Sequence, residues 1–442
     1  METAPGNAAL VLGLCSLTNQ KTGVEPTMKQ LKNFLILWIT QALSQLGSAM
    51  TSFALTLWLY RKTGSALETA LLSICSYAPY VVLSIFAGAL TDRWDKKKTM
   101  LACDALAALC TVTVFVLLKR DALMPWHMYL LNALNGLMNT VQQPASDVAM
   151  TLITPREQYQ RTSGLRSFSN SLVNILHPVL ATALFALGGM DGVIAVDLLT
   201  FAVAFLALMG FVHIPRAALP DRKEPLLQSA RGGLRYLKET PLILHLILFL
   251  AGVNLVASAF NATLPAYVLP RADEATLGMV TSCAGIATLL GSALVMVLPA
   301  PRNRVRVICW SLLMSLGTEN YLLAFARTPF LWCLAQVLGW LPIPLMSANL
   351  DVIFRSTVPV PMQGRVYACR NTLQFFTIPI GYFLGGWMVD RVCEPFMASA
   401  QGIWTALFGS GKGAGASLMM LILALCGTAV CLVFGRLLKN RK

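Results

Sequence analysis

The chain consists largely of long apolar runs separated by short polar turns. An apolar α-helix needs about 20 residues to cross the hydrocarbon core of a bilayer, and runs of this length recur along most of the sequence. The pattern therefore predicts twelve membrane-spanning helices. They lie near residues 33–60, 68–91, 99–118, 126–150, 163–187, 190–212, 241–269, 275–298, 304–326, 329–353, 364–390 and 414–436.

The apolar runs form two groups of six on either side of a polar segment. This segment, residues 213–240, is rich in lysine and arginine and carries leucines that one helix face can collect, so we expect a linker with a surface helix. The expected organisation is a tail, a first half, the linker, a second half and a short tail, at 1–32, 33–212, 213–240, 241–436 and 437–442.

The second half repeats the first. A gap-free shift places Asp147 on Asp351 and Arg166 on Arg370. Charged residues are rare in so apolar a chain, so these matches indicate a duplicated six-helix unit. In duplicated transport proteins the substrate site forms between the halves, near the bilayer midplane.

Composition supports this interpretation. Of the 442 residues, 56% are hydrophobic and only 12% are charged, which is too apolar for a soluble protein. The net charge of +14 comes from short loops and does not form a stripe with interleaved aromatics, so we expect no nucleic-acid partner. We expect a bacterial plasma membrane protein with both termini and the linker in the cytoplasm, because this orientation puts most lysines and arginines on the cytoplasmic side.

The sequence shows no residue pattern typical of a metal site, a disulfide framework or a catalytic site. The 11 cysteines include no C-x-x-C pair and lie mostly within apolar runs, so we expect buried thiols, with neither a metal site nor a disulfide framework. No nucleophile, base and orienting group recur at a usable spacing. The sequence predicts no enzyme and no cofactor.

Charge is concentrated in the turn between the second and third runs. Gly88 allows close backbone approach, Asp92 and Arg93 can pair or cap across the turn, and Lys96 and Lys97 begin a basic cluster suited to an anionic leaflet. We expect this hinge to act as a gate element.

This segment resembles the signature loop between helices 2 and 3 of the major facilitator superfamily, Gly-x-x-x-Asp-Arg-x-Gly followed by two basic residues. Asp95 stands where the second glycine is usual. That variant resembles the macrolide-efflux branch, as do four further segments: Lys62-Thr-Gly-Ser-Ala66, Tyr77-Ala-Pro79-Tyr80, Gly364-Arg365-Val366 and Pro379-Ile-Gly381.

The resemblance implies an all-α polytopic membrane protein with twelve helices in two pseudo-symmetric halves. It also implies a monomeric exporter in the lipid bilayer that exchanges an amphipathic small molecule, macrolide-like or another drug, for protons by alternating access. Two alternatives stay open: a transporter of a physiological solute such as a lipid or siderophore, and a membrane sensor on the same fold that transports nothing.

Several predicted spans carry polar residues at helical spacing, which places each set on one helix face. Such residues either bond across packed helices or line a water-filled cavity, and the resemblance places these helices around the cavity. Rings interleaved with uncharged polar groups suit a bulky amphipathic compound. The predicted cavity residues are Gln41, Gln45, Ser48, Tyr77, Tyr80, Asn132, Asn135, Asn139, Gln142, Asn170, Asn174, Asn254, Asn261, Trp340 and Gln374.

Ionisable groups inside spans are functional candidates. The resemblance puts Asp104 and Asp197 on helices outside the cavity, so we expect structural pairing for both. His177 precedes Pro178, which frees a backbone carbonyl one turn earlier, and a histidine there can change protonation near neutral pH. We take His177 as the proton-coupling candidate, against the alternative of a hydrogen-bonded core histidine.

The repeated charges suggest a gate. Asp147 and Asp351 fall near helix C-termini, which disfavour negative charge, and Arg166 and Arg370 can neutralise them. Either each pair is static within its half, or the pairs exchange partners across the halves, together with the signature loop.

Overall fold

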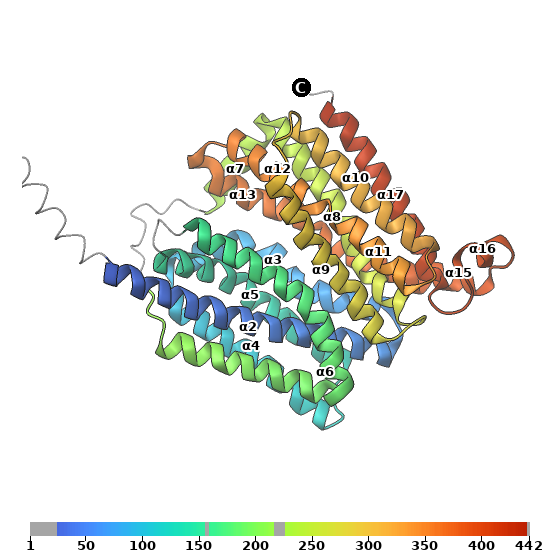
Figure 1. Ribbon diagram of the computed structural model, residues 1–442, viewed down its shortest axis with the longest axis horizontal. Coiled ribbons are helices and arrows are strands. Elements are labelled where there is room, and N and C mark those ends of the chain that lie inside the picture. Colours follow the sequence, from blue (N-terminus) through green and yellow to red (C-terminus); the bar gives the residue numbers. More distant parts are fainter. Residues whose placement is uncertain (1–23, 155–158, 216–225, 440–442) are drawn as a thin grey trace, which may run out of the picture.

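The computed structural model describes residues 24–154, 159–215 and 226–439; the side chains of 24–31, of 84–93 and of scattered positions between 159 and 439 lie outside this description. Every regular element in these ranges is a helix. In Figure 1 the N-terminal half, coloured blue to green, lies below the C-terminal half, coloured yellow-green to red.

In the described residues of the N-terminal half there are five helices, because two predicted spans are continuous in α6. Helix α6 turns back on itself at Gly189, whose φ of 60° is accessible to glycine without a Cβ clash. The bend is visible at the lower right of Figure 1. The helices are α2 (Val24–Thr63), α3 (Ala66–Arg93), α4 (Lys96–Lys119), α5 (Pro125–Ile153) and α6 (Tyr159–Gly210).

The C-terminal half interrupts two predicted spans. The span at 329–353 breaks after Trp340, where Pro342 and Pro344 cannot donate backbone hydrogen bonds, and the span at 364–390 breaks at Phe376, just before Pro379. The elements of the linker and this half are α7 (Leu226–Glu239), α8 (Pro241–Val268), α9 (Glu274–Val297), α10 (Arg304–Phe325), α11 (Pro329–Trp340), α12 (Ile343–Thr357), α13 (Val360–Phe375), α14 (Thr377–Met388), η2 (Val389–Cys393), α15 (Glu394–Ser399), α16 (Ile403–Phe408) and α17 (Ala414–Lys439).

Eight helical segments in the described ranges are long and apolar enough to cross a membrane, and one of them, 165–210, contains two predicted spans. The predicted spans outside this set are α2, α5 and the α13–α14 pair. Polar stripes lower the mean hydropathy of α2 and α5, whereas the break at Phe376 leaves α13 and α14 each shorter than a membrane span.

The halves meet at the end of the bundle opposite the signature loop. We call this end, which contains Arg61 and Gly64, the far end. We call the opposite end, which contains Asp95, the loop end. At the far end Arg61 of α2 forms an ion pair with Glu274 of α9. Asp390 of η2 accepts hydrogen bonds from the first turn of α3.

A seam of small residues joins α6 to α9. A Cβ on Gly285 would lie 2.7 Å from the Ile175 side chain, and a Cβ on Gly278 would lie 3.0 Å from the Pro178 carbonyl oxygen. Between them Ser282 Oγ donates to the Ile175 carbonyl at 2.8 Å. Close approach of this kind lets membrane helices pack without a hydrophobic driving force.

The linker does contain a helix, α7, and part of it packs on the C-terminal half. Leu237 is buried in that half's core, and the Tyr236 hydroxyl donates to the Thr357 carbonyl at 2.9 Å. The face of α7 that carries Tyr236 and Leu237 therefore packs against the C-terminal half.

Candidate functional site

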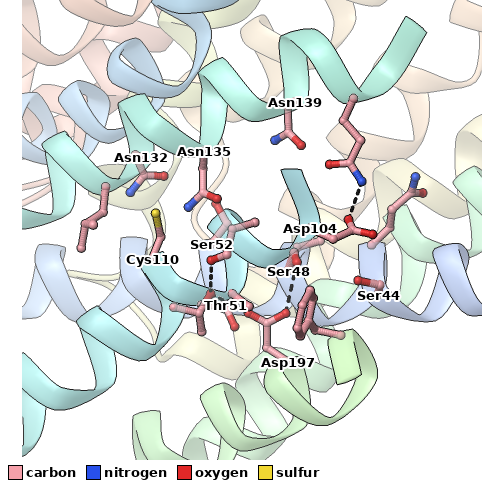
Figure 2. Close-up of a pocket in the computed structure, with 18 of the residues that line it drawn as sticks. Ser44, Ser48, Thr51, Ser52, Asp104, Cys110, Asn132, Asn135, Asn139 and Asp197 are labelled. Carbon is pink, nitrogen blue, oxygen red and sulfur yellow. Dashed lines mark hydrogen bonds between the residues drawn. The ribbon is translucent and has the colours of Figure 1, made fainter. Parts of the chain in front are cut away.

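A polar chamber of about 360 Å³ lies inside the N-terminal half, between α2, α4, α5 and α6, with Ser76 of α3 also on its wall. Figure 2 shows the asparagines of α5 on one side and the serines of α2 on the other. Seven predicted cavity residues line it: Gln41, Gln45, Ser48, Asn132, Asn135, Asn139 and Gln142.

Two buried carboxyl groups also line the chamber, contrary to expectation. Asp104 of α4 accepts hydrogen bonds from the amides of Gln142 and Gln41, the latter at 3.4 Å. It is 7% exposed. The expected position outside the polar space was wrong, because α4 turns this face toward α2 and α5.

Asp197 of α6 is the second carboxyl and is 3% exposed. Ser48 Oγ donates to Asp197 Oδ1 at 3.1 Å, and Thr111 Oγ1 donates to Oδ2 at 3.4 Å. Its hydrogen-bond partners are hydroxyl groups, so the expected structural pairing is not with an opposite charge.

A second pocket, of about 370 Å³, lies at the boundary between the halves. Its wall comes from α2, α3, α5 and α6 of the N-terminal half, with Tyr382 of α14 from the C-terminal half. Tyr77 of α3 and Tyr382 of α14 stack across it with ring centroids 6.2 Å apart. Its wall includes His177 and Asn132 together with hydroxyl groups from α2 and α3. This pocket combines rings, amides and hydroxyls at the boundary between the halves.

His177 lies on this wall with one ring nitrogen engaged. Its Nδ1 is 3.0 Å from the Val173 carbonyl oxygen, which can only accept, so Nδ1 carries the proton. Phe53 packs edge-on against the ring, with centroids 5.9 Å apart. The Nε2 atom is then the nitrogen that can gain or lose a proton.

The other predicted cavity residues lie outside these two pockets. Tyr80 packs on Phe375, with centroids 6.0 Å apart. Asn254 donates to the Gln374 carbonyl at 3.0 Å, which is the helix-to-helix bonding that the sequence left open. Trp340 is half-buried, and three residues are exposed: Asn170, Asn174 and Asn261.

The repeated charge pairs differ between the halves. Arg166 forms an ion pair with Asp147 inside the N-terminal half. Arg370 instead donates from Nε to Gln374 Oε1 at 3.1 Å and lies 4.7 Å from the Phe354 ring centroid, with Asp351 close enough to attract it. The equivalence seen in the sequence is therefore incomplete in the structure.

The signature loop has a structural role that the sequence did not reveal. Asp95 caps α4, because its carboxylate accepts from the Lys98 backbone N–H at 3.0 Å. Lys97 Nζ donates to the Met209 and Val212 carbonyls at 3.0 and 2.8 Å, at the C-terminal end of α6.

The rest of the predicted gate is described only in part. Lys96 is buried, and its Nζ donates to the Trp94 carbonyl at 3.0 Å. Gly88, Asp92 and Arg93 belong to the last turns of α3, and their side chains lie outside the described residues.

Comparisons with known proteins agree with this architecture. The sequence profile of the Major Facilitator Superfamily matches residues 37–273. Macrolide efflux protein A of Streptococcus pyogenes is 24% identical over 81% of this chain and 90% of its own length. The multidrug efflux pump Tap of Mycolicibacterium fortuitum is 25% identical over 78% of this chain and 86% of its own.

Among solved structures, a crystal structure of a mutant of the nucleoside transporter NupG superposes with a TM-score of 0.70 at 14% identity. The match covers 91% of this chain and 99% of that one. This likeness shows a shared fold.

Proposed function

Because this chain belongs to the Major Facilitator Superfamily, and is therefore a multi-pass membrane transporter and not an enzyme, we propose that it exports an amphipathic organic compound. The compound is macrolide-like or another drug, and export proceeds by alternating access in exchange for protons. The observation that carries the proposal is the pocket between the halves, where Tyr77, Tyr382 and His177 surround one space with Asn132. Stacked rings bind an apolar face, and the polar groups orient it.

The proposed orientation places both termini and the linker in the cytoplasm, so that the loop end faces inward. Lysines and arginines favour this arrangement. The Arg61–Glu274 ion pair and the Asp390 contacts hold the far end together. In this orientation the described state is closed to the outside, as expected when an exporter collects its substrate from the cytoplasm.

His177 is the proposed coupling residue. It borders the pocket between the halves, and its ring has one nitrogen free to titrate. A proton taken up there changes the charge beside the bound compound, which links protonation to substrate release. Across 100 mV one charge supplies about 2.3 kcal/mol, enough for roughly a fortyfold gradient.

A resistance panel tests the function. An efflux-deficient bacterium, with and without the protein, is exposed to macrolides, cationic dyes and catecholate siderophores, with Y77A as the pocket variant and Y236F as a matched tyrosine control. The proposal is supported if the wild type confers resistance to the drugs, Y77A loses that resistance and Y236F keeps it. Protection against siderophores alone supports the physiological-solute alternative, and equal sensitivity at verified expression contradicts export.

Coupling is tested separately in vesicles. Export should stop when an ionophore collapses the pH gradient, and His177→Ala should reduce it. Undiminished export in de-energised vesicles under a substrate gradient would identify a facilitator instead.

A further inference from the structure

The surroundings of Asp197 consist of hydroxyl oxygens from neighbouring helices. Ser48 of α2 and Thr111 of α4 contact its two carboxyl oxygens. Thr51 of α2 lies beside the same carboxyl on the chamber wall. In Figure 2 Ser48, Thr51 and Asp197 lie together at one side of the chamber.

The hydrogen bonds among these oxygens do not use their full hydrogen-bonding capacity. The two hydroxyl-to-carboxyl distances of 3.1 and 3.4 Å are longer than the usual distance of about 2.7–2.8 Å for such bonds. Thr51 is 6% exposed, yet its hydroxyl makes no hydrogen bond of acceptable geometry with the described residues. A buried hydroxyl without a full partner is costly and requires an explanation.

The carboxyl group also lacks a compensating charge. The residues known to line the chamber include no lysine, arginine or histidine; their other ionisable groups are Asp104 and Cys110. Burying a carboxylate without a cation carries a large desolvation penalty. Within a membrane such a group is a candidate functional residue, and ion pathways and proton relays are among the roles it serves.

Asp197 is separate from Asp104. The α2 partners of the two carboxyls, Gln41 and Ser48, are two helical turns apart, which is about 10 Å along the axis. The carboxamide N–H groups that bond Asp104 can only donate, whereas the hydroxyls around Asp197 can turn their lone pairs toward a cation. Gly47 makes room for this arrangement, because a Cβ there would lie 2.4 Å from Thr200 Oγ1 and 3.1 Å from Asp197 Oδ1.

We propose that Asp197, with the hydroxyls of Ser48, Thr51 and Thr111, binds a small monovalent cation, either Na⁺ or a proton. A single carboxylate balances one positive charge, and oxygen ligands suit small hard cations. The site lies within one half of the protein. None of its four residues lines the pocket between the halves, although the chamber and that pocket share Ser52, Leu55, Ser76 and Asn132 on their walls. The site needs no exported compound, and its test is independent of the proposed export.

The sodium arm uses the purified full chain in lipid nanodiscs without any drug. Thermal unfolding and radioactive sodium binding are measured in NaCl against choline chloride at constant ionic strength. Saturable, one-to-one binding in the wild type that D197N abolishes supports sodium. D191N is the matched control, because Asp191 lies on the same helix at the surface, paired with Lys119, and its loss should leave binding unchanged.

To test for a proton, the number of protons that the protein binds is measured by titration of the same samples. If the cation is a proton, wild type should bind one more proton than D197N when the samples are titrated from alkaline to acidic pH, whereas D191N should match wild type. This outcome, with no sodium binding, supports the proposal in its proton form.

The hydroxyl groups provide an arm that keeps the carboxylate. T111V should weaken sodium binding or shift the proton titration by roughly tenfold. T113V should do neither. Both threonine hydroxyls bond a carbonyl of their own helix, Thr111 that of Ala107 and Thr113 that of Leu109, but Thr111 also bonds Asp197, whereas Thr113 is not among the residues that line the chamber. If the wild type shows neither sodium binding nor the additional proton, the proposal is wrong. It is also wrong if T111V and T113V behave alike.

Discussion

Replacing Asp390 with alanine should open the far end of the bundle. Asp390 belongs to the C-terminal half, yet its carboxylate caps a helix of the N-terminal half. It accepts from Ser65 Oγ at 2.5 Å, from the Ala66 backbone N–H at 3.0 Å and from the Leu67 N–H at 2.9 Å. These bonds exist only while the halves touch.

The magnitude follows from the cap. Loss of a helix N-cap costs about 1 kcal/mol, and loss of the negative charge at a helix N-terminus adds roughly 0.3–1 kcal/mol. Because a half-buried, charged acceptor is at the strong end of these ranges, D390A should destabilise the closed far end by about 2 kcal/mol. That is roughly a thirtyfold shift toward opening. D390N keeps an acceptor oxygen and loses the charge contribution of roughly 0.3–1 kcal/mol, so it should shift the opening equilibrium only about threefold.

Hydrogen exchange measures this directly. In the purified protein, the peptide that contains the Ala66 and Leu67 amides should exchange about thirtyfold faster in D390A. A peptide covering the start of α9 should also speed up if the halves separate, and should stay slow if only α3 frays. Exchange in D390A that matches wild type, or that merely equals a D191N surface control, would refute the reasoning.

Four other predictions follow from the same architecture. G386A should favour the open far end like D390A, measured by the same exchange, because its new Cβ would meet the α3 backbone at 2.6 Å. Asp92→Asn should leave abundance near normal but abolish transport, and wild-type transport would reduce the signature loop to a topology signal. Alkaline phosphatase fused after Arg235 should be inactive, since the linker is expected in the cytoplasm. A double-mutant cycle between Asp147 and Arg370 should show coupling of roughly 0.5 kcal/mol or more in the inward-to-outward equilibrium if the pairs exchange, and strict additivity if they are static.

Spacing along single helices predicted which polar residues share a face. Asn135 and Asn139 share a face of α5, and that face lines a chamber inside the N-terminal half; its use as a substrate cavity stays a prediction. The family resemblance predicted the membrane-transporter fold that the comparisons confirm. Both predictions rest on local periodicity or on a motif, and neither requires knowledge of how helices rotate against each other.

The placement of Asp104 and Asp197 could not be predicted in this way. Each depends on the rotation of α4 or α6 about its own axis, which packing against several helices decides. A sequence signal existed in hindsight: Asp104 and Thr111 are two helical turns apart on one face of α4, and both reach acidic or polar partners. The Asp390 cap was beyond sequence reasoning, since no local pattern pairs it with Ala66.

That cap has a consequence for how the protein is made. Asp390 and Ala66 are separated by 324 positions, so the ribosome delivers the start of α3 long before the carboxylate that completes it. Until then the new helix has only its own Ser65 hydroxyl, which accepts from the Glu68 N–H at 3.1 Å. The last steps of biogenesis therefore include a docking event in which a late helix finishes an early one, and in chains truncated before Asp390 the start of α3 should be frayed.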